Sequence, residues 1–402
     1  MTKFHFTPTQ EDIINKAVSW YKHSSDQVFQ ITGNPGTGKS VVLNEIISRL
    51  GLSLTDVAPM AYTGAASVVM RMKGLLNAMT IHAWLYDIVQ EPMIDDMGKD
   101  VIDPYFNTPI MRTRFTPRDL KHSGIKLIVI DEGGSVPLNM KEHILGTGIK
   151  VLVAGDLDQL PPVSDNPAFL YSGKVHVLTD IMRQEAYSPI IYLSQRAKRG
   201  LPIHLGNYGK VLVISEDEVT DAMLKASPVI LCCKNRTRET LTAHIRQNIL
   251  RKQSILPSVG EKLICRKNNW TLEEGGINLT NGLTGTVINR PNVREFDGEC
   301  YYVDFVPDIS TNLCFKGIPC NYKYLAADKD QKDAMKKMRH VKGNFLEFGY
   351  AQTVHLAQGS QWTHGMYYEE YLNADINNKL NYTAITRFSD MCIYVKQRRK
   401  YL

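Results

Sequence analysis

A glycine-rich octapeptide is the part of this chain whose residue types and spacing point most directly to chemistry. The pattern G-x-x-x-x-G-K-[ST] is matched in full by Gly33, Asn34, Pro35, Gly36, Thr37, Gly38, Lys39 and Ser40. An apolar run (28–32) precedes this loop, and an amphipathic stretch (41–50) follows it. Its backbone N–H groups would form an anion site, Lys39 would reach the β and γ phosphates, and Ser40 would ligate Mg²⁺. The pattern predicts a nucleoside triphosphate site; the alternative is a glycine-rich turn that binds nothing.

An acidic pair could complete this site. Asp131 and Glu132 directly follow the apolar run 126–130. We expect Asp131 to hold Mg²⁺ and Glu132 to act as the general base on an attacking water. An isolated Asp-Glu pair is more often a solvated turn, but its place after a buried run and behind the glycine-rich loop favours the catalytic interpretation.

Short, continuously apolar runs must position these residues. Runs at 28–32, 126–130 and 151–154 each end in polar residues, which is typical of a parallel sheet covered by helices on both faces. Ligands bind at the carboxyl ends of such strands. A second unit of the same kind begins with the run 229–233, continues as a helical stretch to about residue 252, and resumes over 349–395. The predicted fold class is therefore α/β.

Two segments interrupt this pattern. Residues 86–122 are acidic and then basic, and we interpret them as an inserted excursion. Residues 258–325 carry glycines between short β-like runs, which predicts a small antiparallel barrel or meander. The stretch 326–342 is predicted to be a charged, solvated helix.

Composition excludes several classes of protein. The chain has 402 residues, enough for two to three domains of about 150 residues each. Hydrophobic residues make up 43% and charged residues 22%, which is too apolar for intrinsic disorder. No membrane span or signal peptide is expected, so we predict a cytoplasmic protein. The net charge of +6 permits a polyanionic partner, and the seven cysteines, without CxxC spacing, indicate reduced thiols rather than a zinc site.

The order of the motifs resembles that of superfamily 1 helicases. Besides the loop and the acidic pair, the resemblance rests on residues 155–163 (Gly-Asp-Leu-Asp-Gln-Leu-Pro-Pro-Val), 354–360 (Val-His-Leu-Ala-Gln-Gly-Ser) and 382–387 (Tyr-Thr-Ala-Ile-Thr-Arg). The form of residues 155–163 is similar to the RecD and Dda-like branch, superfamily 1B, whose members are P-loop NTPases. The resemblance extends from Gln10 to Arg387.

The resemblance implies two RecA-like parallel-sheet motor domains with an inserted β-hairpin, or pin, and an inserted SH3-like β-domain. Motor domain 1A would comprise 1–85 and 119–200, and the pin subdomain 1B would comprise 86–118. Motor domain 2A would comprise 201–257 and 343–402. The SH3-like insertion 2B and the helix after it would comprise 258–342.

Roles at the nucleotide site also follow from the resemblance. The implied catalytic residues are Lys39, Asp131, Glu132, Gln159, Arg183 and Arg387. Nucleotide contacts are expected from the eight loop residues, from Gly359 and from Gln10, which matches an adenine-reading glutamine. Ser40 and Asp131 would hold the metal.

The resemblance places a DNA strand across both motor domains. The implied DNA-binding residues are Pro59, Thr63, Ala65, Thr80, His82, Thr353 and His355. Tyr105, Phe106 and Phe115 could form a wedge on the pin, although segment 86–122 could instead be a decorated surface loop. Trp270 is interpreted as a core residue in preference to a DNA contact. Two departures from the family pattern are Gly133-Gly134, which could alter coupling between ATP and DNA, and Leu356, where a basic residue is usual.

The implied function is an ATP-dependent 5′ to 3′ DNA helicase that uses ATP and Mg²⁺. Expected partners are single-stranded DNA and junctions of single- and double-stranded DNA, with a single-strand-binding or replication protein as a further candidate. We expect a monomer that binds no membrane. Two alternatives stay open: a DNA-stimulated ATPase that remodels protein–DNA complexes without unwinding, and a non-catalytic DNA-binding scaffold. The sequence does not distinguish replication, recombination and repair.

Overall fold

The chain divides into two compact units in a computed structural model. Unit 1 comprises Met1–Ile81, Leu120–Gln253 and Tyr350–Leu402, and unit 2 comprises His82–Asp119 and Ser254–Gly349. The structure describes residues 5–102, 109, 111–161, 169–171, 173–180, 188–290, 299–310, 312–337 and 341–397. Within these residues, no helix is long and apolar enough to cross a membrane.

Unit 1 contains a first sheet of six parallel strands in the order β3-β2-β6-β7-β1-β8. The strands are β1 (Val28–Gly33), β2 (Val57–Ala61), β3 (Met79–Thr80), β6 (Leu127–Asp131), β7 (Lys150–Gly155) and β8 (Val175–Leu178). In this sheet Thr32 is paired with Gly155, and Ala61 with Asp131. The register therefore brings the carboxyl ends of β1, β2, β6 and β7 to one edge.

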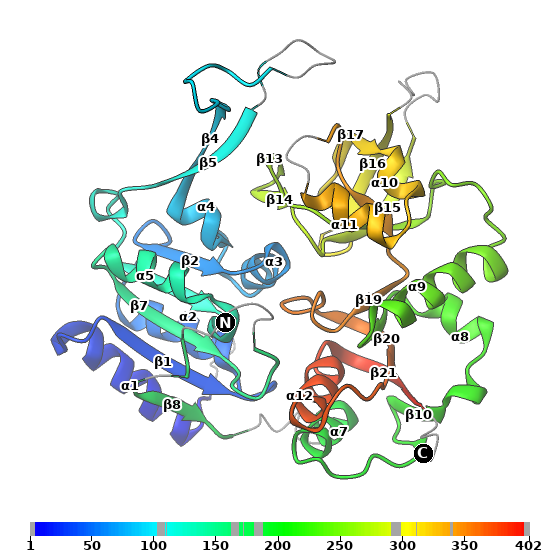
Figure 1. The fold of residues 1–402 in the computed structure, drawn as a ribbon. Coiled ribbons are helices and arrows are strands. Elements are labelled where there is room, and N and C mark those ends of the chain that lie inside the picture. The colour runs from blue at the N-terminus through cyan, green and yellow to red at the C-terminus, as the bar shows by residue number, and fades with distance from the viewer. Residues whose placement is uncertain are drawn as a thin grey trace. The chain divides into compact units, whose positions relative to one another are not determined.

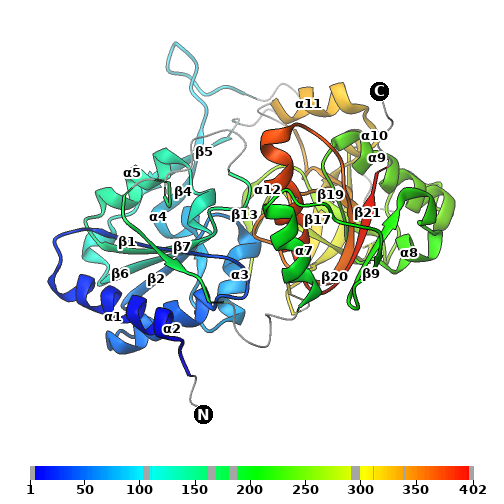
Figure 2. The ribbon, with the colours of Figure 1, turned by 90° about the horizontal axis from the view of Figure 1, so that it is seen from below.

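Helices cover both faces of the first sheet, with α1 and α2 on one face and α5 on the other (Figure 2). The helical segments are α1 (Pro8–His23), α2 (Lys39–Arg49), α3 (Gly64–Met72), α5 (Leu138–Gly146) and the 3₁₀ turns η1 (Leu120–His122) and η2 (Gly133–Ser135). Helix α1 begins with a capping box, in which Thr7 and Gln10 each accept the other's backbone N–H.

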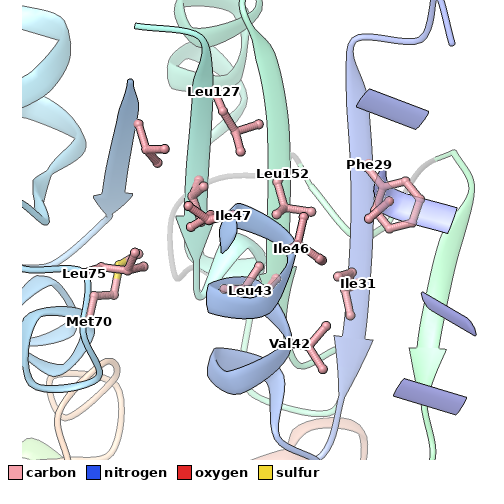
Figure 3. Close-up of a cluster of buried hydrophobic side chains, with 14 of the residues drawn as sticks. Phe29, Ile31, Val42, Leu43, Ile46, Ile47, Met70, Leu75, Leu127 and Leu152 are labelled. Carbon is pink, nitrogen blue, oxygen red and sulfur yellow. The ribbon is translucent and has the colours of Figure 1, made fainter. Parts of the chain in front are cut away.

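The core under α2 holds the phosphate-binding loop in place. Figure 3 shows Val42, Leu43 and Ile46 of α2 directed towards Ile31 of β1 and Leu152 of β7. All five side chains are at most 1% exposed. Burying one such side chain stabilises a fold by roughly 1.5–3 kcal/mol, so α2 is fixed firmly to the two strands.

A second sheet in unit 1 has the order β19-β11-β20-β21-β10-β9, in which β9 is antiparallel to β10 and the other neighbours are parallel. The strands are β9 (Gly206–Asn207), β10 (Val211–Ser215), β11 (Ile230–Cys232), β19 (Ala351–Thr353), β20 (Trp362–Tyr368) and β21 (Phe388–Lys396). The helical segments are α7 (Pro189–Lys198), η3 (Glu216–Glu218), α8 (Asp221–Ala226), α9 (Asn235–His244), the π-helical turn η4 (Ile245–Ile249) and α12 (Ala374–Ile385).

Helices α7 and α12 lie side by side (Figures 1 and 2). The predicted α/β class with parallel sheets is confirmed. Because both sheets belong to one unit, the boundary between two motor domains at residue 200 remains a prediction.

Unit 2 contains an antiparallel sheet in the order β17-β16-β15-β12-β18, a two-stranded ribbon and a separate hairpin. The sheet strands are β12 (Lys262–Cys265), β15 (Thr284–Asn289), β16 (Cys300–Pro307), β17 (Phe315–Asn321) and β18 (Leu346–Phe348). The ribbon is β13 (Asn269–Glu274) with β14 (Ile277–Leu279), and the hairpin is β4 (Tyr86–Pro92) with β5 (Met111–Pro117).

The remaining helices of unit 2 are short. They are α4 (Ile81–Leu85), which begins at the last residue of the preceding unit 1 segment, α10 (Tyr322–Ala326) and α11 (Lys329–Lys337). The stretch predicted as one charged helix over 326–342 thus contains the end of α10 and the separate helix α11. The identification of the antiparallel sheet as an SH3-like domain stays a prediction.

The turn after β6 explains one departure from the family pattern. A Cβ atom on Gly133 would lie 2.3 Å from Cγ1 of Val153, whereas a Cβ on Gly134 would have its nearest neighbour at 3.8 Å. Gly133 is thus required by the close approach of this turn to β7, and Gly134 is not.

We therefore expect Gly133→Ala to lower the free energy of unfolding by about 1–3 kcal/mol, because the buried Val153 must move. Gly134→Ala is the matched control and should change it by less than about 0.5 kcal/mol. Urea denaturation of both variants measures the difference. Equal stability of the two variants would contradict the packing argument.

Candidate functional site

A pocket of about 450 Å³ lies where the first sheet ends, and it gathers most of the predicted nucleotide-site residues. Those that line it are Pro35, Gly36, Gly38, Lys39, Ser40, Asp131, Glu132, Gln159, Gly359 and Arg387. Residues that follow strands of the first sheet and residues from the second-sheet region of unit 1 thus line one cavity.

The phosphate-binding loop has the backbone conformation that its glycines permit. Gly36 and Gly38 have φ values of 81° and 77°, in the left-handed region that favours glycine. Gly38 directly precedes α2, so the positive end of the helix dipole faces the loop. The Lys39 ammonium donates to the carbonyl oxygens of Gly33 (2.6 Å) and Asn34 (3.1 Å). The loop therefore presents a helix N-terminus and a lysine at one point, which suits a bound phosphate.

The acidic pair lies at the end of β6. Asp131 Oδ1 accepts a hydrogen bond from the Glu132 backbone N–H at 2.9 Å. Glu132 has a φ of 54°, which is uncommon for a residue with a side chain and costs backbone strain. Burial raises the pKa of the Glu132 carboxyl, although the nearby Arg387 and Lys39 oppose this effect. A carboxylate with a raised pKa is a better proton acceptor near neutral pH, as a general base needs to be.

Arg387 and Gln159 join the two sheets at the pocket. The Arg387 guanidinium donates to Oε1 of Gln159 at 3.0 Å, to the Thr383 carbonyl at 3.2 Å and to the Ser360 carbonyl at 3.3 Å. Arg387 is 5% exposed and Gln159 is 9% exposed. A buried cation is thus held at the pocket by Gln159, which follows the first sheet, and by two carbonyls from the second-sheet region, where it can stabilise negative charge on a phosphoryl group.

Gln10 lies behind the loop rather than in the pocket lining. Its amide Nε2 donates to the Thr37 carbonyl at 3.0 Å, and its Oε1 accepts from the Thr7 backbone N–H at 3.0 Å. The side chain is 2% exposed. Gln10 therefore ties the start of α1 to the loop. Its adenine-reading role stays a prediction, and binding adenine would require these bonds to be replaced.

The predicted loop residues Gly33, Asn34 and Thr37 are also absent from the described pocket lining.

Three predicted site residues lie outside the described part of the chain: Arg183, Tyr105 and Phe106. Conversely, several described residues line the pocket that sequence reasoning did not identify: Val41, Asn44, Ala66, Val69, Lys73, Ser360, Gln361 and Thr386. Helical spacing could have identified Asn44, which lies one turn after Ser40 on α2. Nothing local in the sequence marks the α3 residues.

The predicted DNA-binding residues of unit 1 lie within or just after strands and at one helix start. Pro59 in β2 and Thr80 at the end of β3 are buried, and Thr353 ends β19 at 7% exposure. Thr63 caps α3 by accepting from the Ala66 N–H at 3.2 Å, and Ala65 lies in the first turn of that helix. His355 follows β19, and burial lowers its pKa.

Helix α3 connects these candidates to the pocket that Lys39 and Asp131 line. Its residues Ala66 and Val69 line the pocket, while Thr63 is its N-cap. A Cβ on Gly359 would lie 2.4 Å from Oγ1 of Thr63, and Gly359 has a φ of 79°. Gly359, which lines the pocket, therefore lies so close to the N-terminus of α3 that a larger residue would clash with Thr63.

The remaining predicted DNA residue, His82, belongs to an aromatic cluster in unit 2. Its ring lies 4.5 Å from that of Trp270 in β13, 5.7 Å from Phe115 and 5.9 Å from Tyr86. Phe115 also contacts Trp270 edge to face at 5.7 Å and pairs in register with Ile88. Phe115 thus lies near the base of the hairpin, where it can anchor it. Its predicted wedge role stays a prediction, and Trp270 is half-buried in this cluster, as a packing residue would be.

Comparisons with known proteins give a consistent family and fold. The AAA domain family matches residues 5–215. The ATP-dependent RecD2 DNA helicase of Deinococcus radiodurans is 23% identical over 386 residues, which cover 90% of this chain and 46% of that protein. The ATP-dependent DNA helicase Pif1 of a Psychrobacter species is 30% identical over 145 residues, or 33% of this chain and 19% of that protein. The chain spans less than half the length of these curated relatives.

Solved structures share the fold. A Pif1 helicase structure concerned with unwinding at forked double-stranded DNA has a TM-score of 0.54 and 16% identity, covering 98% of this chain and 92% of its own. The Bacteroides Pif1 in complex with ADP-AlF3 and single-stranded DNA also has a TM-score of 0.54, with 15% identity and the same two coverages, 98% and 92%. At this identity the likeness establishes the arrangement of elements.

The half-buried histidine of unit 2, His82, gives a pH-dependent stability. Burial lowers the pKa of His82 to about 4, from its usual 6.5. As the pH falls, His82 takes up its proton near pH 6.5 in the unfolded chain but only near pH 4 in the folded chain. The folded state is therefore fully stable with respect to this group above pH 6.5, and it loses stability relative to the unfolded chain as the pH falls towards 4.

Between pH 7 and pH 5 the wild-type chain should lose about 2 kcal/mol more unfolding free energy than His82→Phe, in which no proton can bind. Denaturant unfolding of both proteins at the two pH values measures this difference. Parallel losses in the two proteins would show that His82 is not buried in its neutral form.

Proposed function

The chain belongs to the AAA domain family, and from this premise we propose that it is an ATP-dependent DNA helicase that moves 5′ to 3′ along single-stranded DNA. The observation that carries the proposal is the pocket in which Lys39, Glu132 and Arg387 meet. Lys39 and Glu132 follow strands β1 and β6 of the first sheet, and Arg387 directly precedes β21 of the second. A nucleotide bound there would contact residues attached to both sheets. Its hydrolysis could therefore change how the two sheets are positioned relative to each other.

The residues of the pocket divide the chemistry between them. The loop amides and Lys39 would hold the β and γ phosphates. Glu132 would accept a proton from the attacking water. Arg387 would stabilise the negative charge that spreads over the transferring phosphoryl group. Arg183 is proposed for a similar role on the ground of the family resemblance alone.

The oxygen donors of the pocket suit Mg²⁺. The Ser40 hydroxyl and the Asp131 carboxylate line the same cavity. No group of three or more acidic, histidine or cysteine side chains that could hold a metal occurs among the described residues. Mg²⁺ commonly binds one or two protein oxygens together with substrate phosphates and water, and Ser40 and Asp131 could supply two such oxygens. When bound, the ion would neutralise charge on those phosphates.

DNA would be held by small side chains and backbone amides that do not distinguish bases. Our candidates in unit 1 are Thr63 and Ala65 at the start of α3 and Thr353 at the end of β19. Helix α3 also lines the nucleotide pocket. Such contacts are made to phosphates, so binding should weaken as salt is raised. Alternating grips on the strand, driven by closing and opening of the pocket, would move the protein along.

The names of the relatives support this proposal. The matching RecD2 and Pif1 proteins are named ATP-dependent DNA helicases, and a solved Pif1 structure contains single-stranded DNA. The 5′ to 3′ direction rests on the resemblance to the RecD and Dda-like branch. We further propose that the protein acts as a monomer at single-strand and duplex junctions in the cytoplasm. Its seven free thiols, six of them buried, suit a reducing compartment.

A second function, that of a DNA-stimulated ATPase that does not unwind, is favoured by one observation. The one predicted wedge aromatic in the described residues, Phe115, packs against Trp270 near the base of the hairpin. An aromatic side chain held there cannot also be the leading surface of a wedge.

Strand displacement distinguishes these functions. Two partial duplexes, one with a 5′ tail and one with a 3′ tail, are incubated at low salt with ATP and Mg²⁺ while phosphate release is recorded. We expect displacement of the 5′-tailed duplex alone. DNA-stimulated phosphate release without displacement on either substrate would favour the remodelling ATPase, and displacement of the 3′-tailed duplex would overturn the direction.

Two substitutions test the pocket. Lys39→Ala should abolish nucleotide binding and hydrolysis, whereas Glu132→Gln should keep nucleotide binding and lower kcat by about 100-fold or more, because the proton acceptor is lost. Lys126→Ala, which breaks an exposed ion pair with Asp56 elsewhere in unit 1, is the control. Binding of a fluorescent ATP analogue and phosphate release are measured. Full hydrolysis by Lys39→Ala would refute both catalytic functions.

A further inference from the structure

The segment that follows β7, residues 156–160, is bonded to the second sheet's helices and loops at each of its five residues. We call it the bridging segment. Its partners are Tyr382 for Asp156, Lys379 for the Leu157 carbonyl, Lys198 for Asp158, Arg387 for Gln159, and Thr383 and Gln358 for the backbone of Leu160. The family resemblance assigns a role to Gln159 here, and it leaves the partners of Asp156 and Asp158 unexplained.

The contact between Tyr382 and Asp156 is the most deeply buried of these. The Tyr382 hydroxyl donates to Oδ2 of Asp156 at 2.5 Å, and the two residues are 0% and 4% exposed. The same hydroxyl lies 3.3 Å from Oδ1 of Asn34 in the phosphate-binding loop. Burial and the neighbouring Asp156 carboxylate raise the pKa of Tyr382, so the hydroxyl keeps its proton and acts as a donor. One hydroxyl of α12 thus reaches both the bridging segment and the loop.

Lys198, the last residue of α7, repeats this arrangement from the adjacent helix. Its ammonium forms an ion pair with Asp158 of the bridging segment and donates to Oδ1 of Asn34 at 3.3 Å. The backbone carbonyl of Asn34 in turn accepts from Lys39 at 3.1 Å and from the Thr37 hydroxyl at 2.8 Å. Asn34 therefore joins the internal bonds of the loop to two side chains that come from the second sheet.

We propose that Tyr382 and Lys198 are positioning residues, which fix the phosphate-binding loop through Asn34 and the bridging segment through Asp156 and Asp158 whenever the two sheets are closed around a nucleotide. The inference rests on the proposed function and extends it. The Asn34 side chain contacts Tyr382 and Lys198 from the second-sheet region, so the position of that region affects the conformation of the phosphate-binding loop. Neither residue is part of the pocket lining, so neither would touch the reacting phosphate.

The geometry explains why closure and catalysis would be coupled. Lys39 is bonded to the Gly33 and Asn34 carbonyls, and holding a phosphate would draw its ammonium from them. The side-chain contacts of Asn34 with Tyr382 and Lys198 would then keep the loop in shape. If the sheets separate, both contacts and the six bonds of the bridging segment are lost together, so the catalytic arrangement exists in the closed state alone.

Tyr382→Phe keeps the buried ring and removes the hydroxyl. We expect kcat for DNA-stimulated ATP hydrolysis to fall about tenfold, because a charge-assisted bond that holds the closed state is lost. KM for ATP should change less than about threefold, since the phosphate contacts of the loop itself remain. The matched control is Tyr367→Phe. Tyr367 is also 0% exposed and its hydroxyl donates at 2.6 Å to Asn381 of the same helix α12, but it does not reach the loop or the bridging segment.

A second variant keeps the test decisive if Tyr382→Phe does not fold. Lys198→Gln removes an ion pair whose two side chains are 31% and 34% exposed. It should also lower kcat. Lys126→Gln, which removes an ion pair elsewhere in unit 1, is its control. Unchanged kcat in both Tyr382→Phe and Lys198→Gln, or an equal loss in Tyr367→Phe, would overturn the proposal.

Amide hydrogen exchange separates this inference from the proposed function. Exchange at Asn34, Gly36, Thr37 and residues 156–160 should become faster in Tyr382→Phe and stay unchanged in Tyr367→Phe, whether or not the wild type hydrolyses ATP. Absence of hydrolysis in the wild type with normal binding of DNA would refute the helicase proposal. Unchanged exchange in Tyr382→Phe would refute the positioning role.

Discussion

The pocket of unit 1 depends on one constraint, the parallel register of the first sheet. Parallel strands all end at the same edge, so the loop after β1, the acidic pair after β6 and the bridging segment after β7 must lie together. The core under α2 then fixes the direction of the loop, because α2 begins at Lys39 itself. The second sheet completes the pocket with Arg387.

Close approach of backbones sets the second condition. Gly133 leaves room for Val153, Gly38 lies against the Gln10 amide, and Gly359 lies against Thr63. Each of these positions brings two separate parts of unit 1 nearer than a side chain would permit. Glycine at these three positions therefore allows contacts between segments of unit 1 that a Cβ atom would prevent.

Local motifs were predictable, whereas contacts between distant residues were not. The phosphate-binding loop and the pair Asp131-Glu132 are contiguous in sequence and follow apolar runs, so their types and spacing were sufficient. Tyr382 and Asp156 are separated by 226 residues, and no spacing rule relates them. The position of Phe115 depends on the pairing of β4 with β5, whose alternation of polar and apolar residues is too weak to set the register. The bonds of Gln10 required knowledge of where α1 begins.

The distribution of thiols has a practical consequence. Of the seven cysteines, all within the described residues, six are buried and Cys314 is half-buried in unit 2. Burial raises the pKa of Cys265, Cys320 and Cys392, and also that of Cys314, so Cys314 differs from these three by its greater accessibility to an alkylating dye. A maleimide fluorophore should therefore attach first at Cys314, and the native chain provides a single-dye reporter of unit 2 without any engineered cysteine.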